Sequence, residues 1–251
     1  MIIRPLIYLL FFLSTCTSLK DRSLIHAFKF TDKNRQELKR VLGQYQEDSP
    51  KFAASHFIIR NMLGKQSVDT NSIKASQPYF DAWAAYFEKY GRYKNGAHYV
   101  ICDSINRLHP NKRVHTRYIP DLQHISADFL IRHIDYCFHI WQQYPWCKDI
   151  DFDTFCKYIL PYTTSNCYWE YASDFFLEKY AELRDTVQQK SYKEIGAILS
   201  KDVDRTFAQN WVLFTRKYPG LLPTTFENLA KAQIGTCLEA NIYKIAALRA
   251  N

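Results

Sequence analysis

Apolar side chains recur every three or four residues along most of the chain, which is the period of an amphipathic α-helix. The pattern is clearest in three stretches, whose apolar positions are Leu38, Val41, Leu42 and Tyr45, then Phe80, Trp83, Ala84 and Phe87, and then Leu130, Ile134, Cys137, Phe138 and Trp141. We therefore expect a mostly α fold in which each of these stripes faces a core.

Residues that commonly begin or end helices flank these stretches. Ser126 is expected to be the N-cap of the third helix, and Asp151 or Asp153 to cap a short helix that Pro161 ends. Gly91 is a plausible C-cap for the second. Between these helices, residues 107–121 are expected to form an exposed loop or a pair of strands. We assign no catalytic or metal-binding role to the histidines in that segment, because they have no partners at ligand spacing.

The composition supports a packed protein and excludes several classes. The chain has 251 residues, of which 47% are hydrophobic, so it can bury a sizeable core. Its 7 glycines and 9 prolines are too few for a β-sandwich or a low-complexity chain. The formal net charge is +8, but acidic residues are interspersed among the basic ones. This pattern is typical of a solvated surface, and we expect no nucleic-acid partner.

The first residues have the pattern of a secretory signal. Arg4 precedes an apolar stretch from Pro5 to Leu13, which is too short to span a bilayer but suits a signal peptide. The following Leu13-Ser14-Thr15-Cys16 resembles a bacterial lipobox, in which the cysteine is lipidated. We expect residues 1–15 to be a lipoprotein signal peptide and residues 16–30 a tether. Cys16 would then anchor the chain to a membrane in the bacterial envelope, periplasmic or surface-exposed. The alternative is an ordinary secretory signal with an incidental cysteine.

Six further cysteines follow along the chain, which are Cys102, Cys137, Cys147, Cys156, Cys167 and Cys237. If the chain is exported, they lie in a compartment that permits disulfides. None has C-x-x-C spacing, and no Cys/His cluster has the spacing of a zinc site, so we expect no metal and no cofactor. Cys137 lies on an apolar stripe and is expected to be buried. One disulfide among the first five is compatible with the sequence, which does not select the pair.

The C-terminal segment contains the best candidate for chemistry. Thr225 is expected to cap a short helix, Gly235 to break it, and Thr236 and Cys237 to open a second one. Unpaired N–H groups and the helix macrodipole in a first turn favour a thiolate, which is the nucleophilic form. Gly235 would leave room for a substrate carbonyl near the backbone. These features suit acyl transfer through a thioester, provided that a histidine accepts the proton. The alternative is a structural or incidental cysteine.

Residues 222–250, LPTTFENLAKAQIGTCLEANIYKIAALRA, resemble the cysteine segment of the transglutaminase-like (papain-like) superfamily. Residues 121–162 resemble the helical region that precedes the core in secreted bacterial transglutaminase-like lipoproteins. That likeness is carried by Pro145, Trp146, Phe152, Phe155, Cys156 and 160–162. The resemblance implies that Cys237 is the catalytic nucleophile of cysteine-dependent acyl transfer or amide hydrolysis on peptides. Glu239 lies where many members carry an acidic residue, and no role is assigned to it.

The sequence departs from this superfamily in two ways. The residues after Pro161-Tyr162 lack an expected arginine. The family's catalytic histidine and aspartate lie on strands after the cysteine helix, but the fourteen residues after Cys237 contain neither. The expected fold is thus a helical N-terminal region, residues 31–190, followed by the opening helices of an incomplete papain-like α+β core, residues 191–251. We expect this truncated domain to be inactive alone.

Two other interpretations remain open from the sequence. In one, the chain is a helical envelope lipoprotein that binds a peptide, glycan or protein partner without catalysis, and Cys237 is structural. In the other, it is an envelope scaffold with no site of its own. The many tyrosines and tryptophans would suit carbohydrate stacking, although aromatic stripes more often belong to a core.

Overall fold

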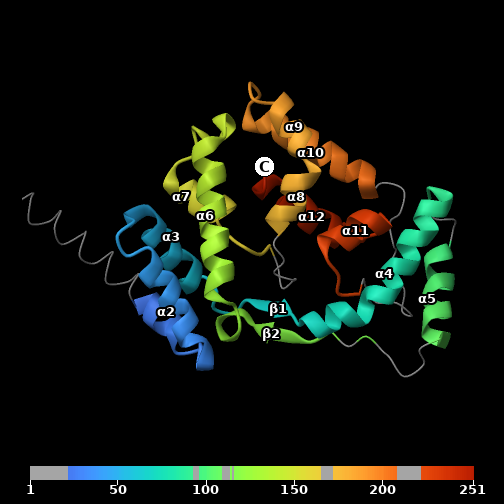
Figure 1. Ribbon diagram of the computed structural model, residues 1–251, viewed down its shortest axis with the longest axis horizontal. Coiled ribbons are helices and arrows are strands. Elements are labelled where there is room, and N and C mark those ends of the chain that lie inside the picture. Colours follow the sequence, from blue (N-terminus) through green and yellow to red (C-terminus); the bar gives the residue numbers. More distant parts are fainter. Residues whose placement is uncertain (1–21, 93–95, 109–113, 115, 165–171, 208–221) are drawn as a thin grey trace, which may run out of the picture. The chain divides into compact units, whose positions relative to one another are not determined.

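The computed structural model describes residues 22–92, 96–108, 114, 116–164, 172–207 and 222–251. They are mostly helical, which confirms the expected class. The α-helices are α2 (Arg35–Gln44), α3 (Ser49–Arg60), α4 (Thr70–Tyr90), α5 (Ala97–Leu108), α6 (Ala127–Gln143), α7 (Phe152–Thr154), α8 (Ala172–Lys179), α9 (Ala181–Thr186), α10 (Tyr192–Phe207), α11 (Phe226–Ala232) and α12 (Cys237–Arg249) (Figure 1). Short 3₁₀ turns are η1 (Asp32–Asn34), η2 (Asp121–Gln123) and η3 (Pro145–Cys147), and η4 (Phe155–Ile159) is a π-helix.

Several helix ends lie where local chemistry predicts them. The hydroxyl of Ser126 accepts a hydrogen bond from the amide of Phe129 at 3.2 Å. The carboxylate of Asp151 accepts one from the amide of Thr154 at 2.7 Å, so it, rather than Asp153, is the cap. Gly91 ends α4 in the left-handed conformation, with φ at 67°. These caps satisfy backbone groups that a helix end leaves unpaired.

Helix α4 begins at Thr70, well before Phe80, the first apolar position of the predicted stripe, and it continues through Pro78. A proline inside a helix removes one backbone hydrogen bond and crowds the carbonyl four residues earlier. The helix is nevertheless capped at its start by Asp69, which accepts from the amide of Asn71 at 3.1 Å. The hydroxyl of Ser76 also donates to the carbonyl of Pro223, so contacts far along the sequence hold the helix where local spacing disfavours it.

A two-stranded sheet pairs β1 (Gln66–Val68) with β2 (Tyr118–Pro120). The second strand lies in the segment that was expected to be a loop or a strand pair, but its partner precedes α4 instead of lying within that segment. His109 and His115 lie outside the described residues.

The chain divides into two compact units, which are residues 1–65 with 120–135 and residues 66–119 with 136–251. This division does not coincide with the expected boundary after residue 190. In the first unit, α2 and α3 pack together and bury residues such as Leu38 and Ile59. Residues 22–28 are helical, with Leu24 and Ala27 buried. From residue 22 onward, the expected tether is therefore packed structure, because it supplies apolar side chains to a core.

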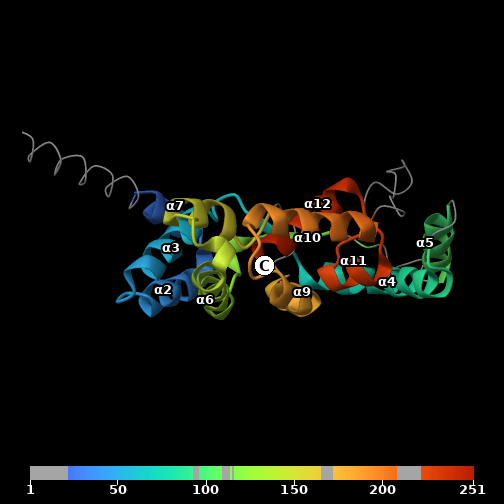
Figure 2. The same cartoon turned by 90° about the horizontal axis from the view of Figure 1, so that it is seen from above.

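The second unit is organised around α12. This helix packs against α8 and α10, and α11 packs against α4 and α8 (Figures 1 and 2). The side chain of Tyr243 on α12 is 0% exposed. Its ring centroid lies 4.8 Å from that of Phe176, 5.3 Å from that of Phe207 and 5.8 Å from that of Phe226. Three neighbouring helices thus meet α12 through one aromatic cluster.

The hydroxyl groups of Tyr243 and Tyr180 have contrasting environments. The Tyr180 hydroxyl donates to the Asp202 carboxylate at 2.8 Å. Within the described residues, the buried Tyr243 hydroxyl has no hydrogen-bond partner. Leaving such a group buried and unpaired costs roughly 1–3 kcal/mol.

This contrast predicts opposite effects of two matched substitutions. Tyr243→Phe should raise the free energy of unfolding by about 1 kcal/mol, because it removes a desolvated hydroxyl and keeps the ring. Tyr180→Phe should lower it by about 1–2 kcal/mol, because it removes a hydrogen bond to a carboxylate. Urea unfolding of both variants measures these changes. A similar loss in both would contradict the prediction and would show that the Tyr243 hydroxyl is satisfied.

Candidate functional site

The candidate site lies where the short helix α11 gives way to α12. As predicted, Thr225 caps α11, and its hydroxyl accepts from the amide of Asn228 at 3.1 Å. The helix ends at Ala232 because Gln233 adopts the left-handed conformation, with φ at 48°. The expected breaker, Gly235, is not the residue with positive φ. Helix α12 then begins at Cys237, as predicted, with Thr236 as its N-cap.

A capping box fixes the first turn of α12. The amide of Leu238 donates to the Thr236 hydroxyl oxygen at 3.2 Å, and the amide of Thr236 donates to the Glu239 carboxylate at 3.0 Å. The Thr236 hydroxyl also contacts this carboxylate. Burial raises the pKa of the Glu239 carboxyl above its ordinary value, against the opposing effect of these backbone hydrogen bonds. Glu239 therefore has a structural role that the T-x-x-E spacing could have indicated.

Gly235 has a packing role. A Cβ atom at this position would lie 3.0 and 3.1 Å from two ring carbons of Phe207 on α10. Such distances are shorter than ordinary carbon–carbon contacts. The space beside Gly235, expected to admit a substrate carbonyl, is therefore occupied on that side by an aromatic ring. This contact could not be read from local spacing, because Phe207 belongs to a separate helix.

Cys237 differs from the other described cysteines in its accessibility. Its side chain is exposed, whereas Cys102, Cys137, Cys147 and Cys156 are buried. Burial raises the pKa of the Cys102 and Cys137 thiols to about 12 and that of the Cys147 thiol to about 11. Thiols held in this way are poor nucleophiles. The burial of Cys137 confirms the sequence prediction. Cys16 and Cys167 lie outside the described residues, so lipidation and disulfide pairing stay predictions.

The other end of α12 is held by Arg249. Its Nε atom donates to the carbonyl of Tyr158 at 3.0 Å, and its Nη1 atom lies 3.1 Å from the carbonyl of Pro161 and 3.2 Å from that of Thr163. Burial lowers the pKa of the guanidinium. Arg249 thus joins α12 to the segment that follows η4.

Trp146 in η3 also forms a hydrogen bond with the segment that ends α12. Its indole N–H donates to the main-chain oxygen of Asn251 at 2.7 Å. Residues 145–162 and 222–251 therefore contact each other within one unit, although they are far apart in the sequence. These long-range contacts were missed from the sequence, which offers no local signal for them.

Comparison of the chain with protein-family models, curated proteins and solved structures found no match. Within the described ranges, no group of three or more His, Cys, Asp or Glu side chains is placed to hold a metal ion. No helix in the part of the chain that the structure describes is both long and apolar enough to cross a membrane. Of the two predicted site residues, Cys16 and Cys237, only Cys237 lies within the described ranges.

The raised pKa of Glu239 predicts a pH-dependent contribution to stability. The folded chain holds this proton more tightly than the unfolded chain. The contribution of this tighter proton binding to the free energy of unfolding is therefore fully present below the unfolded-state pKa of Glu239. It is lost as the pH rises through the folded-state pKa. In urea unfolding between about pH 4 and about pH 7, the native chain should lose stability with rising pH relative to Glu239→Gln. A difference between the two chains that is constant across this range would contradict the prediction.

Proposed function

We propose that Cys237 is the nucleophile of a transglutaminase-like site for cysteine-dependent acyl transfer or amide hydrolysis on peptides. The observation that carries the proposal is the exposure of its sulfur at the first position of a capped helix, while the other described cysteines are buried. This exposure allows a substrate carbonyl to reach the side chain of Cys237. The resemblance of the surrounding segment to the superfamily supports the same assignment.

In the proposed reaction, the Cys237 thiolate attacks the carbonyl carbon of an amide, and a new carbon–sulfur bond forms as the carbonyl oxygen becomes an oxyanion. The amine then leaves with a proton, and a thioester remains. Water regenerates the thiolate in hydrolysis, and a second amine does so in transfer. The amide of Leu238 is already bound to Thr236. We therefore assign the oxyanion hydrogen bond to the amide of Cys237 itself.

The proposal requires a general base that the cysteine helix does not provide. The superfamily resemblance implies a histidine and an aspartate on the C-terminal side of α12, and residues 238–251 contain neither. Loss of general-base assistance slows such reactions by about 10²–10⁴-fold. A chain that lacks such a base is expected to form a thioester with an activated ester and to turn over amides very slowly.

The assignment predicts selective reactivity of Cys237. At about pH 7, iodoacetamide should label it far faster than the buried cysteines, with the sites mapped by mass spectrometry. The matched control is the double variant Cys237→Ala/Asn241→Cys, which moves the thiol one turn along the exposed face of α12. Because the unpaired N–H groups lie in the first turn, the native thiol should react about threefold faster than the displaced one.

A second measurement separates a nucleophile from an exposed thiol. Incubation with 4-nitrophenyl acetate should leave an acetyl group on Cys237 of the native chain and a smaller yield on the displaced thiol. Equal rates of alkylation and equal yields of acetylation for the two thiols would contradict the assignment. Cys237 would then be an ordinary surface residue.

We also infer that Cys16 carries a lipid that attaches the chain to the bacterial envelope, on the strength of the lipobox-like sequence alone. Expression with labelled palmitate in a bacterial host should label the native chain and move it into the detergent phase of a Triton X-114 partition. Cys16→Ser should abolish both the label and the partition. An unlabelled native chain recovered from the medium would favour an ordinary secretory signal.

A binding protein without catalysis is the second candidate. Tyr158 and Tyr192 expose 67% and 54% of their surface, and exposed aromatic rings suit stacking against sugars or peptides. Specific retention on a glycan or peptide array that is unchanged in Cys237→Ala would favour this candidate over the nucleophile.

A further inference from the structure

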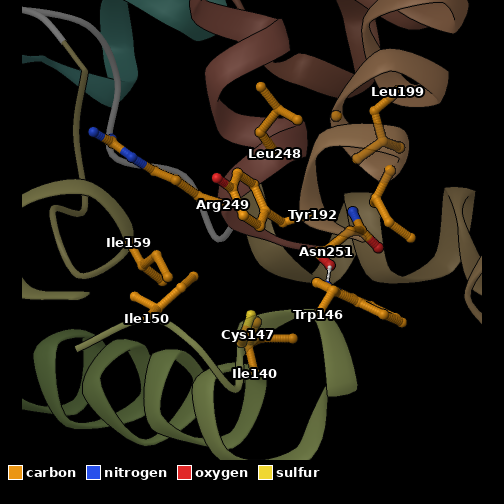
Figure 3. A pocket seen from close by; sticks show the side chains of 12 residues that line it. Ile140, Trp146, Cys147, Ile150, Ile159, Tyr192, Leu199, Leu248, Arg249 and Asn251 are labelled. Carbon is orange, nitrogen blue, oxygen red and sulfur yellow. Dashed lines mark hydrogen bonds between the residues drawn. The ribbon is translucent and has the colours of Figure 1, made fainter. Parts of the chain in front are cut away.

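A cavity of about 180 Å³ lies in the second unit, at the end of α12 opposite Cys237 (Figure 3). Its walls come from α6, η3, α10 and α12 and include Ile140, Cys147, Ile195 and Leu199. Tyr192 and Leu248 also line it and are 54% and 39% exposed, so they form a rim through which a small molecule could enter.

Two polar side chains at this cavity, those of Arg249 and Asn251, are engaged elsewhere. Arg249 directs its guanidinium away from Leu248, Leu199 and Trp146 (Figure 3). It donates hydrogen bonds to the carbonyls of Tyr158 and Thr163. The Asn251 side-chain oxygen accepts from Arg184 at 2.6 Å, and its amide nitrogen donates to Ala247 at 3.0 Å. An ordered water needs two to four polar partners. Walls of this kind favour an apolar occupant over water.

A glycine in the middle of α10 helps to keep the cavity open. Gly196 lines the cavity, and its φ is not in the left-handed range, so the backbone does not require glycine there. A Cβ atom would meet only Leu248 Cδ2, at an ordinary 3.7 Å. Glycine inside a helix costs about 1 kcal/mol relative to alanine. Gly196 therefore lowers helix stability without a steric or conformational need, and its effect is to leave space at the wall.

We propose that this cavity is a binding site for a small apolar molecule with a single ring. The volume supports that size class, because an engineered cavity of about 150 Å³ with similar walls binds benzene. The isoleucine and leucine side chains of the wall offer an apolar surface to such a ring, and the open side of the cavity allows exchange with solvent. This site is independent of the proposed nucleophile. Helix α12 rises about 1.5 Å per residue, which places its two ends about 18 Å apart.

The test uses toluene and the full chain, with isoleucine methyl groups labelled for NMR. Toluene should shift the methyl signals of the wall residues Ile140, Ile150 and Ile195 in a saturable way, through the ring current of the bound molecule. Ile58 and Ile59, which are buried in the first unit, serve as internal controls and should not move.

The matched variants are Gly196→Leu, which fills the cavity, and Gly43→Leu, which replaces a helical glycine with open space around it. Toluene should bind Gly43→Leu as tightly as the native chain and Gly196→Leu at least about tenfold more weakly. If Gly196→Leu does not fold, Leu248→Trp blocks the rim from a position that is already partly exposed.

Three outcomes would overturn the proposal. The first is the absence of a saturable shift in a folded chain up to the solubility limit of toluene. The second is equal shifts at the control isoleucines, which would mean non-specific partition. The third is unchanged binding in the folded filled or blocked variant, which would place the toluene elsewhere.

Discussion

The second unit depends on the burial of one ring, that of Tyr243, against phenylalanines from three other helices. Phe176 comes from α8, Phe207 ends α10 and Phe226 begins α11. Aromatic pairs at such distances contribute about 0.5–1.5 kcal/mol each beyond the area that they bury. The three helices are separate in the sequence and meet through α12, so its place in the core determines the place of the others. An unpaired hydroxyl at the centre of the cluster is tolerated because the ring fills the space.

This packing also explains why the N-terminus of α12 is well defined. Phe207 lies against Gly235, so the turn that leads into the helix cannot shift toward α10. On the opposite side, Gln77 and Asn228 exchange two hydrogen bonds, of 3.1 and 2.7 Å, and so hold α11 against α4. These contacts hold α11 and the turn before α12 against neighbouring helices of the second unit, and Cys237 begins the helix that follows this turn.

The helices could be predicted from the sequence where local signals decide them. Ser126, Asp151 and Gly91 lie at the helix ends that their side chains or backbone freedom favour. Local signals failed where distant contacts decide the structure. Helix α4 continues through Pro78, where contacts such as that of Ser76 with Pro223 outweigh the intrinsic preference of the residue. Helix α11 ends at Gln233 in the left-handed conformation, two residues before the predicted breaker Gly235.

In the candidate site, too, features set by local sequence were predicted and contacts between distant segments were not. The cysteine at a helix start was predicted from Gly235, Thr236 and Cys237, because the signals that begin a helix are local. The contact of Gly235 with Phe207 and the hydrogen bonds of Arg249 to residues 158–163 were not predicted, because they join segments that are far apart along the chain. Periodicity shows which face of a helix is buried and does not show which segment covers it.

Four residues of α12 and of the turn before it have structural roles in the second unit. Thr236 and Glu239 are accounted for by the capping box, Gly235 by its contact with Phe207, and Arg249 by its carbonyl partners. The signs of the two charges also match the macrodipole, with the carboxylate in the first turn of α12 and the guanidinium in the last. Cys237 lies among these residues with its side chain exposed to solvent. Packing and capping account for these four residues, and the proposal that Cys237 is a nucleophile rests on its exposure at the start of the helix.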